Sequence, residues 1–121
     1  MALKSLRELV NIASGKGSKT LVVAVAQDED VLGAVKMAMD ARIIIPVLVG
    51  DHDAIRASAD QAGLDLSAIE IIHEHDKSLA CARAVKLVRE GRAQLLMKGM
   101  VSTGMLVKAI LDKEIGLLSG S

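Results

Sequence analysis

The residues best suited to chemistry lie between positions 95 and 103, where an apolar run meets a cation, a glycine and two hydroxyls. The segment reads Leu-Leu-Met-Lys-Gly-Met-Val-Ser-Thr, which places Lys98, Gly99, Ser102 and Thr103 in one short stretch. This order is typical of a strand, a tight loop and the first turn of a helix. Such a turn carries free N–H groups and a partial positive charge, so with Lys98 it could hold phosphate. An ordinary turn glycine beside an ordinary N-cap gives the same pattern, and both interpretations stay open.

Short apolar runs alternate with helical patterns along the whole chain, and these elements must position the loop. Predicted strands cover residues 21–26, 43–50, 68–72 and 95–97. Predicted helices cover residues 3–13, 28–42, 51–63, 76–89 and 103–114. Asp28, Asp51 or Asp53, and Asp76 or Ser78 are the expected N-caps. Pro46 conflicts with its strand, which should therefore lie at a sheet edge or begin after the proline.

Alternating strands and helices with short connections predict right-handed βαβ units. The expected fold is a three-layer α/β sandwich with a mainly parallel sheet, formed as one domain over residues 1–117 with a tail at 118–121. Parallel sheets bind ligands at the carboxyl ends of their strands, close to the point where the strand order reverses. In this chain those ends carry Gln27–Asp28, Gly50–Asp51, His73–Asp76 and Lys98–Thr103.

Composition argues against several classes of partner. The 121 residues include no Phe, Tyr or Trp, so bases cannot stack on aromatic rings as they do in single-strand nucleic-acid binding. Fifteen basic residues balance fifteen acidic ones, and the net charge of zero steers the chain to neither nucleic acid nor an anionic membrane. No run is long enough to cross a bilayer. Cys81 is the one cysteine, which fits a reducing, cytoplasmic compartment.

Residues 14–20 superficially resemble a phosphate-binding P-loop. The sequence Ser-Gly-Lys-Gly-Ser-Lys-Thr lacks the required glycines, because Ala13 and Ser18 stand at those positions. A P-loop also follows a strand and opens a helix, whereas this segment precedes a strand. We interpret it as a solvated connection.

Two further side-chain groups have an ordinary structural explanation. His73 and His75 would share one face of a strand and could bind a metal, but no third spaced ligand is evident, so no metal site is predicted. Cys81 lies among alanines on an apolar helix face, where a buried thiol is expected. Acidic residues after the first strand, with Asp76 and Lys98, loosely imitate a signalling receiver domain, although Lys98 follows the fourth strand rather than the fifth.

Several segments together resemble the phosphate acetyl/butyryltransferase family, and the butyryl branch more closely. The resemblance rests on residues 95–103 with the following Leu-Val-Lys-Ala-Ile-Leu-Asp-Lys-Glu-Ile-Gly-Leu, and on residues 23–32, 45–51 and 84–91. It covers essentially the whole chain in one register. The Lys-Gly…Ser-Thr segment is its most specific part.

The resemblance implies an isocitrate/isopropylmalate dehydrogenase-like fold and an enzyme that moves an acyl group between coenzyme A and inorganic phosphate. Coenzyme A would be a substrate, and no resident cofactor is implied. Lys98, Gly99, Ser102 and Thr103 carry over as a substrate-binding loop. Met97, Met100 and Met105 flank it and could line an acyl or pantetheine pocket, with core filling as the alternative.

Members of this family are about twice this length, so we expect the chain to be their N-terminal portion. The serine, arginine and aspartate that the family uses in catalysis would then lie elsewhere, and no catalytic residue can be named. A non-catalytic anion-binding or self-assembling module is the alternative function. Exposed strand edges and apolar helix faces favour a homo-oligomer.

Overall fold

The computed structural model describes residues 19–118, with side chains described as far as residue 111. The predicted helix at 3–13 and most of the 14–20 connection lie outside these residues, as does most of the predicted tail. Lys19 and Thr20 begin a strand, which agrees with the connection preceding a strand. The elements in chain order are β1 (Lys19–Ala24), α2 (Glu29–Asp40), β2 (Ile44–Gly50), α3 (His52–Ala62), β3 (Glu70–His73), α4 (Lys77–Arg89), β4 (Leu95–Lys98) and α5 (Thr103–Leu118).

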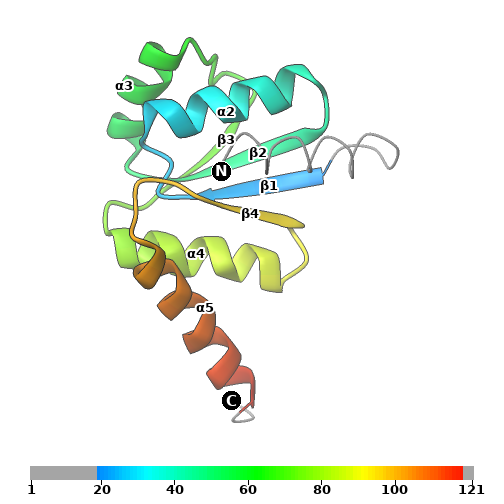
Figure 1. The fold of residues 1–121 in the computed structure, drawn as a ribbon, viewed down its shortest axis with the longest axis vertical. Helices are drawn as coiled ribbons and strands as arrows, with labels where there is room; N and C mark the ends of the chain where they lie inside the picture. The colour runs from blue at the N-terminus through cyan, green and yellow to red at the C-terminus, as the bar shows by residue number, and fades with distance from the viewer. Residues whose placement is uncertain (1–18, 119–121) are drawn as a thin grey trace.

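The four strands form one parallel sheet in the order β3-β2-β1-β4, which confirms the predicted fold class. Helices α2 and α3 cover one face, and α4 with the start of α5 covers the other (Figure 1). In the nucleotide-binding type of doubly wound sheet β1 has these same neighbours, whereas in a receiver domain it lies between β2 and β3. The strand order therefore argues against the receiver interpretation.

Strand β1 lies inside the sheet and is apolar on both faces, as its continuous run of valine and leucine predicts. Its residues from Leu21 to Ala24 are buried. Val23 packs into the core under α2 and α3, while Val22 packs into the core under α4. Without any aromatic residue, both cores are built from aliphatic side chains, and α4 contributes small ones such as Ala80, Cys81 and Ala84.

The predicted aspartate caps are confirmed at three helix starts. The carboxylate of Asp28 accepts the N–H of Val31 at 3.1 Å, that of Asp51 accepts the N–H of Asp53 at 3.1 Å, and that of Asp76 accepts the N–H of Leu79 at 3.0 Å. Each of these bonds satisfies a donor that the helix itself leaves free. Helix α3 ends at Gly63 in the left-handed conformation (φ 72°), as its sequence predicts.

The prediction for Pro46 is wrong, because β2 is an inner strand and begins before the proline. Pro46 pairs with Leu21 of β1. Even-numbered residues of β2 direct their hydrogen bonds toward β3, as the bond from the Glu74 N–H to the Gly50 carbonyl shows. Strand β3 begins only opposite Val47. The Pro46 nitrogen carries no proton, and it points to the side of β2 where the pairing with β3 has not yet begun, so no ladder hydrogen bond is lost.

Other boundaries shift by a few residues. Strand β1 begins and ends two residues before the predicted strand, and β3 begins two residues later than predicted. Helix α5 continues to Leu118, past the predicted end at 114 and into the predicted tail. Among the described residues, no helix combines the length and apolar character needed to cross a membrane.

Candidate functional site

The strand order reverses between β1 and β4, and the segment from Lys98 to Thr103, called here the Lys98 loop, lies at that point. From β1 the chain builds outward to β2 and β3, then returns through α4 to place β4 on the other side of β1. The connections that leave β1 and β4 lead to helices on opposite faces of the sheet (Figure 1). Ligands of open α/β sheets bind in the crevice that such diverging connections create.

Lys98 is the last residue of β4, and its side chain folds back over the loop that follows. The ammonium nitrogen donates to the carbonyl oxygen of Val101 at 3.0 Å. An ammonium group has three N–H donors, so this bond uses one of them. The cation is therefore held beside the start of α5 with donors to spare.

Ser102 is the N-cap of α5, and Thr103 is the first helical residue. The hydroxyl of Ser102 accepts the N–H of Met105 at 3.1 Å, and its carbonyl accepts the N–H of Leu106 at 3.3 Å. Both Ser102 and Thr103 are exposed. The structure thus brings the four predicted residues into one loop, with the hydroxyl of Ser102 engaged in capping.

Gly99 is required by space, because the loop passes directly against the turn that follows β1. Its N–H donates to the carbonyl of Ala24 at 2.9 Å, and the N–H of Met100 donates to the carbonyl of Val25 at 2.7 Å. A Cβ on Gly99 would collide with the Val25 oxygen and lie 2.8 Å from the Ala24 oxygen. The sequence suggested only a turn glycine here, whereas the structure shows a close backbone approach.

The turn after β1 carries two features that sequence reasoning missed. Val25 is fully buried and adopts a positive φ of 60°, which is unusual for a β-branched residue. The side-chain oxygen of Gln27 is buried without a hydrogen-bond partner and lies against Gly50 at the end of β2. Nothing in the residue types signals the backbone of Val25, since valine there is typical of an ordinary strand.

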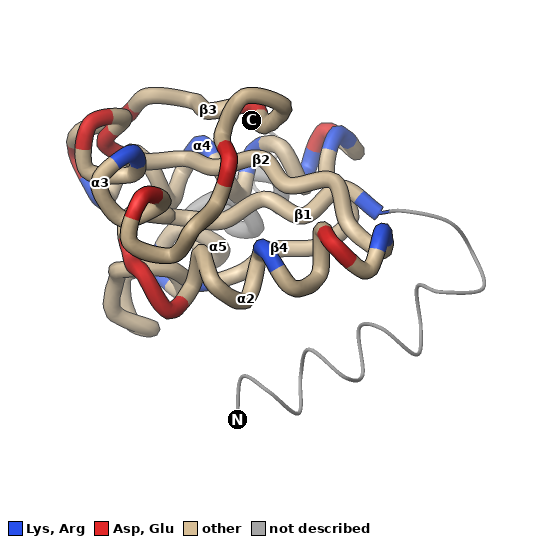
Figure 2. Tube along the Cα trace, turned by 90° about the horizontal axis from the view of Figure 1, so that it is seen from above, with Lys and Arg blue, Asp and Glu red and all other residues tan. Residues whose placement is uncertain are grey.

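Charge distinguishes the start of α5 from the starts of α2 and α3. Helix α2 has Glu29 and Asp30 in its first turn, and α3 has Asp53, whereas the first turn of α5 has no acidic residue. Figure 2 shows the acidic positions gathered where α2 and α3 begin. An anion at the sheet edge is therefore repelled from those two helices and attracted to Lys98 and α5.

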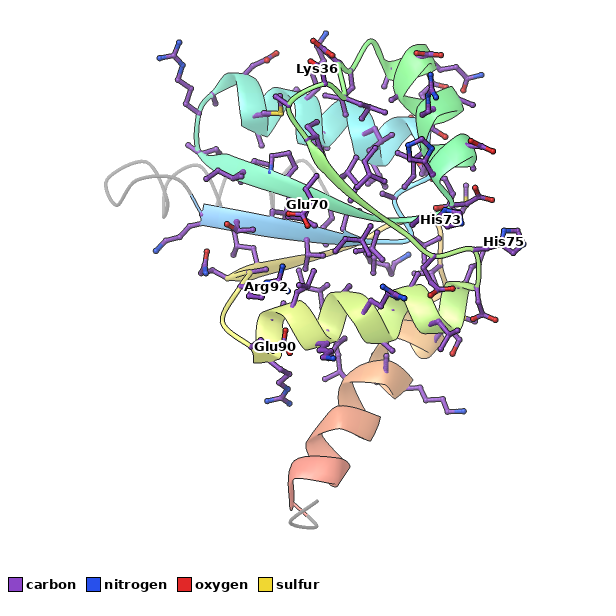
Figure 3. All side chains as sticks on the ribbon, turned by 180° about the vertical axis from the view of Figure 1, so that it is seen from behind. Lys36, Glu70, His73, His75, Glu90 and Arg92 are labelled. Atoms are coloured by element: carbon purple, nitrogen blue, oxygen red, sulfur yellow. The ribbon has the colours of Figure 1, made fainter. Side chains whose placement is uncertain are left out.

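A second polar cluster lies at the carboxyl ends of β2 and β3 and contains all three histidines of the chain. The Nδ1 of His73 accepts the backbone N–H of His52 at 3.1 Å, and the Nδ1 of His75 lies 3.0 Å from Asp51 Oδ2. The bond with His75 lowers the pKa of Asp51 below its usual value, and the backbone N–H groups of Ala54 and Asp53 add to this. Figure 3 shows His73 and His75 at the same edge of the sheet.

The prediction that His73 and His75 share one face of a strand is wrong, because β3 ends at His73. His75 lies in the connection to α4, with 85% of its side chain exposed. Within the described part of the chain, no three His, Cys, Asp or Glu side chains are arranged to hold a metal ion.

Cys81 is a buried side chain of α4, as predicted, and it packs in the core on that face of the sheet. Burial raises the pKa of its thiol above the usual value, so the sulfur stays protonated at neutral pH. A protonated, enclosed thiol contributes to packing and is a poor nucleophile.

Comparison with known proteins places the chain in a family. The model of the phosphate acetyl/butaryl transferase family matches residues 4–80. A phosphate butyryltransferase of Clostridium acetobutylicum is 42% identical over 118 residues, which are 98% of this chain and 39% of that protein. A phosphate acetyltransferase of Thermotoga maritima is 37% identical over 115 residues, which are 95% of this chain and 38% of that protein.

The fold is also similar to that of a solved structure. A branched-chain phosphotransacylase from Enterococcus faecalis has a TM-score of 0.61 at 23% identity, over 78% of this chain and 33% of that one. The chain thus spans about two fifths of the length of these two transferases. The family match and the shared fold agree with the resemblance carried by the Lys98 segment, and the chain belongs to the phosphate acetyl/butaryl transferase family.

Proposed function

We propose that this chain forms one wall of the active site of an acyltransferase that moves an acyl group between coenzyme A and inorganic phosphate. Family membership supports the reaction class. The observation that carries the proposal is the position of Lys98, whose ammonium lies beside an acid-free helix start where the strand order reverses. Phosphate groups are recognised by this combination of a cation and backbone N–H donors.

In this reaction the thiolate of coenzyme A attacks the acyl carbonyl of an acyl phosphate. A carbon–sulfur bond forms, the bond from carbon to the phosphate oxygen breaks, and phosphate leaves with the electron pair. Lys98 would hold the phosphate, or a phosphate group of coenzyme A, through the donors that Val101 leaves free. The backbone N–H groups of the first turn of α5 and the exposed hydroxyl of Thr103 would complete the anion site.

The methionines near the loop do not act as one group. Met97 packs on the α2 and α3 side of the sheet, whereas Met100 and Met105 are exposed beside the Lys98 loop. Our proposal therefore assigns to Met100 and Met105, and not to Met97, a contact with the acyl or pantetheine part of the substrate. Methionine adapts well to such flexible apolar ligands.

The test is the thermal unfolding of the chain, followed by circular dichroism because there is no tryptophan, with and without inorganic phosphate and coenzyme A. A ligand at 100 times its Kd that binds only the folded chain adds about 2.7 kcal/mol to the free energy of unfolding. We expect a rise in the midpoint that Lys98→Ala removes and that Lys86→Ala, an exposed change on α4, retains. No rise in the wild-type chain, or an equal rise in Lys98→Ala, would contradict the proposal.

A non-catalytic anion-binding module would give the same midpoint rise without turnover. Formation of butyryl-coenzyme A from butyryl phosphate and coenzyme A separates the two functions. The enzyme proposal needs turnover in the protein that contains this chain, and loss of turnover efficiency in its Lys98→Ala variant. Binding without turnover would favour the module.

Within the proposal the protein works in the cytoplasm as a homo-oligomer. The lone buried thiol of Cys81 fits a reducing compartment. Helix α5 exposes Val107 and Leu111, with 44% and 51% of each residue accessible, and within residues 19–118 no strand pairs with the outer edge of β4. A second copy of the chain would cover this surface. Light scattering after gel filtration tests this, and Leu111→Glu should shift the mass toward the monomer.

A further inference from the structure

The turn that follows β1 contains a backbone conformation that the sequence does not favour. Val25 has a φ of 60°, and its side chain is fully buried. Left-handed backbone is a genuine outlier for a β-branched residue, and such outliers persist only where the surrounding structure enforces them. Among the described residues, Arg42 is the other non-glycine with positive φ, but it is exposed and follows the end of α2.

The neighbours of Val25 show what this conformation achieves. Its carbonyl accepts the N–H of Met100 at 2.7 Å, one residue after Ala24 accepts the N–H of Gly99 at 2.9 Å. Strands β1 and β4 end as a pair at Ala24 and Lys98, so these two bonds continue the pairing beyond the strands. The turn and the Lys98 loop are thus joined as one unit.

Gly99 makes the junction possible from the other side. A Cβ at this position would collide with the Val25 oxygen and approach the Val25 carbonyl carbon to 2.8 Å. These contacts are with backbone atoms, which cannot move aside as a flexible side chain can. By contrast, a Cβ on Gly33 in α2 meets nothing within 4 Å.

We propose that Val25 and Gly99 are positioning residues that fix the ammonium of Lys98 at the anion site. Gly99 follows Lys98 directly, and two residues later the Val101 carbonyl accepts the Lys98 ammonium at 3.0 Å. Holding the backbone at 99 and 100 against β1 therefore fixes both the root of the lysine and the carbonyl that orients its tip. The inference rests on the proposed function in that it names how the proposed anion site keeps its geometry.

The experiment measures the acetylation rate of each lysine of the chain by limiting acetic anhydride and mass spectrometry. Lys36 and Lys86, on α2 and α4, are internal references for general reactivity, and circular dichroism of each variant reports any unfolding. Gly99→Ala should raise the rate of Lys98 by roughly two- to tenfold, the factor implied by the loss of one hydrogen bond. The reference rates should not change, and Gly33→Ala should match the wild type at all three lysines.

A second variant decides the matter if circular dichroism shows that Gly99→Ala is unfolded. Val25→Gly adds no atom. It removes a buried side chain and widens the range of backbone conformations open to the turn, so it should raise the acetylation rate of Lys98 alone. Val22→Ala, which empties space in the same core without touching the turn, is its matched control. An unchanged Lys98 rate in a folded Gly99→Ala chain, or in Val25→Gly where that variant decides, overturns the proposal.

Repeating the measurement in inorganic phosphate separates this inference from the proposed function. Phosphate should protect Lys98 in the wild-type chain and protect it much less in Gly99→Ala. Equal protection in both chains would show that Gly99 does not act through Lys98. Absence of protection in the wild type, with the variant effects intact, would remove the phosphate site and leave the positioning of Lys98 standing.

Discussion

The two halves of the carboxyl edge of the sheet use polar residues in opposite ways. At the ends of β2 and β3, Asp51 contacts His75, and Glu74 contacts Arg83 at 3.0 Å, so each carboxylate has a polar side-chain partner. At the ends of β1 and β4, the ammonium of Lys98 contacts only a backbone carbonyl among the described residues, and the adjacent helix start has no acid. A charge without a carboxylate partner remains available to an anionic ligand, whereas a paired one is already neutralised.

The two regions also differ in how their backbone is held. The β2–α3 connection is held by the aspartate cap at Asp51 and by the His73 ring, which accepts the His52 N–H at 3.1 Å. The β1–α2 and β4–α5 connections instead bond to each other through Val25 and Met100, across a contact that leaves no room for a side chain at residue 99. The first region is held through side-chain hydrogen bonds and the second through a tight contact between backbones, so mutations should affect them unequally.

The largest effect on stability should come from Gly99→Ala. The new methyl group collides with backbone oxygens of β1 and its turn, and overpacking of this kind should cost about 3 kcal/mol of unfolding free energy. Urea unfolding followed by circular dichroism measures it. Gly33→Ala is the control, and it should match the wild type or exceed it, because alanine favours the helix and meets open space. Similar midpoints for the two variants would show that the contact at residue 99 can accommodate a side chain.

A smaller effect should follow from Ser102→Ala, because the hydroxyl of Ser102 caps α5. Loss of an N-cap costs about 1 kcal/mol, and glycine at the same position costs only a few tenths. In the same urea assay the wild type should therefore be the most stable, Ser102→Gly slightly less stable and Ser102→Ala the least stable. If Ser102→Ala unfolds at the wild-type midpoint, the hydroxyl does not cap the helix and is free for a ligand.

The smallest effect should be a shift in acid sensitivity in His75→Ala. The pKa of Asp51 is lowered mainly by its bond to His75, so the folded state is favoured above the usual carboxyl pKa and loses this contribution as pH falls through the lowered value. Without His75 that pKa rises toward its ordinary value, and the contribution to stability above the usual carboxyl pKa becomes smaller. In acid unfolding followed by circular dichroism, His75→Ala should therefore unfold at a slightly higher pH than the wild type. His52→Ala, whose ring lies 3.6 Å from Asp53 instead, should leave the transition in place.

Local signals in the sequence were enough for the elements and much of the loop. Asp28, Asp51 and Asp76 cap helices as predicted because capping involves residues only two or three positions apart. The grouping of Lys98 with Ser102 also follows from one contiguous segment, and the family resemblance follows from that segment together with residues 23–32, 45–51 and 84–91. These features depend on neighbours in the chain, which a single sequence displays directly.

Features set by distant partners could not be predicted. Pro46 is tolerated inside the sheet because β3 begins late, and the left-handed Val25 accepts a hydrogen bond from a loop more than seventy residues away in the chain. The end of β3 at His73 separated two histidines that alternation placed together. In each case the deciding contact comes from another element, whose register no local pattern records.

The pairing of β1 with β4 also bears on when the candidate site can exist during folding. Strands β1, β2 and β3 join through successive neighbours, but the hydrogen bond from Thr20 to Gln94 spans 74 residues. Contacts between such distant residues carry a large loop-closure entropy and form slowly until the intervening helices have shortened the path. During synthesis on the ribosome, the turn at Val25 must therefore wait for Gly99 to emerge. Until then, the edge of β1 that pairs with β4 in the folded chain is exposed. During this interval the nascent chain is most open to mispairing.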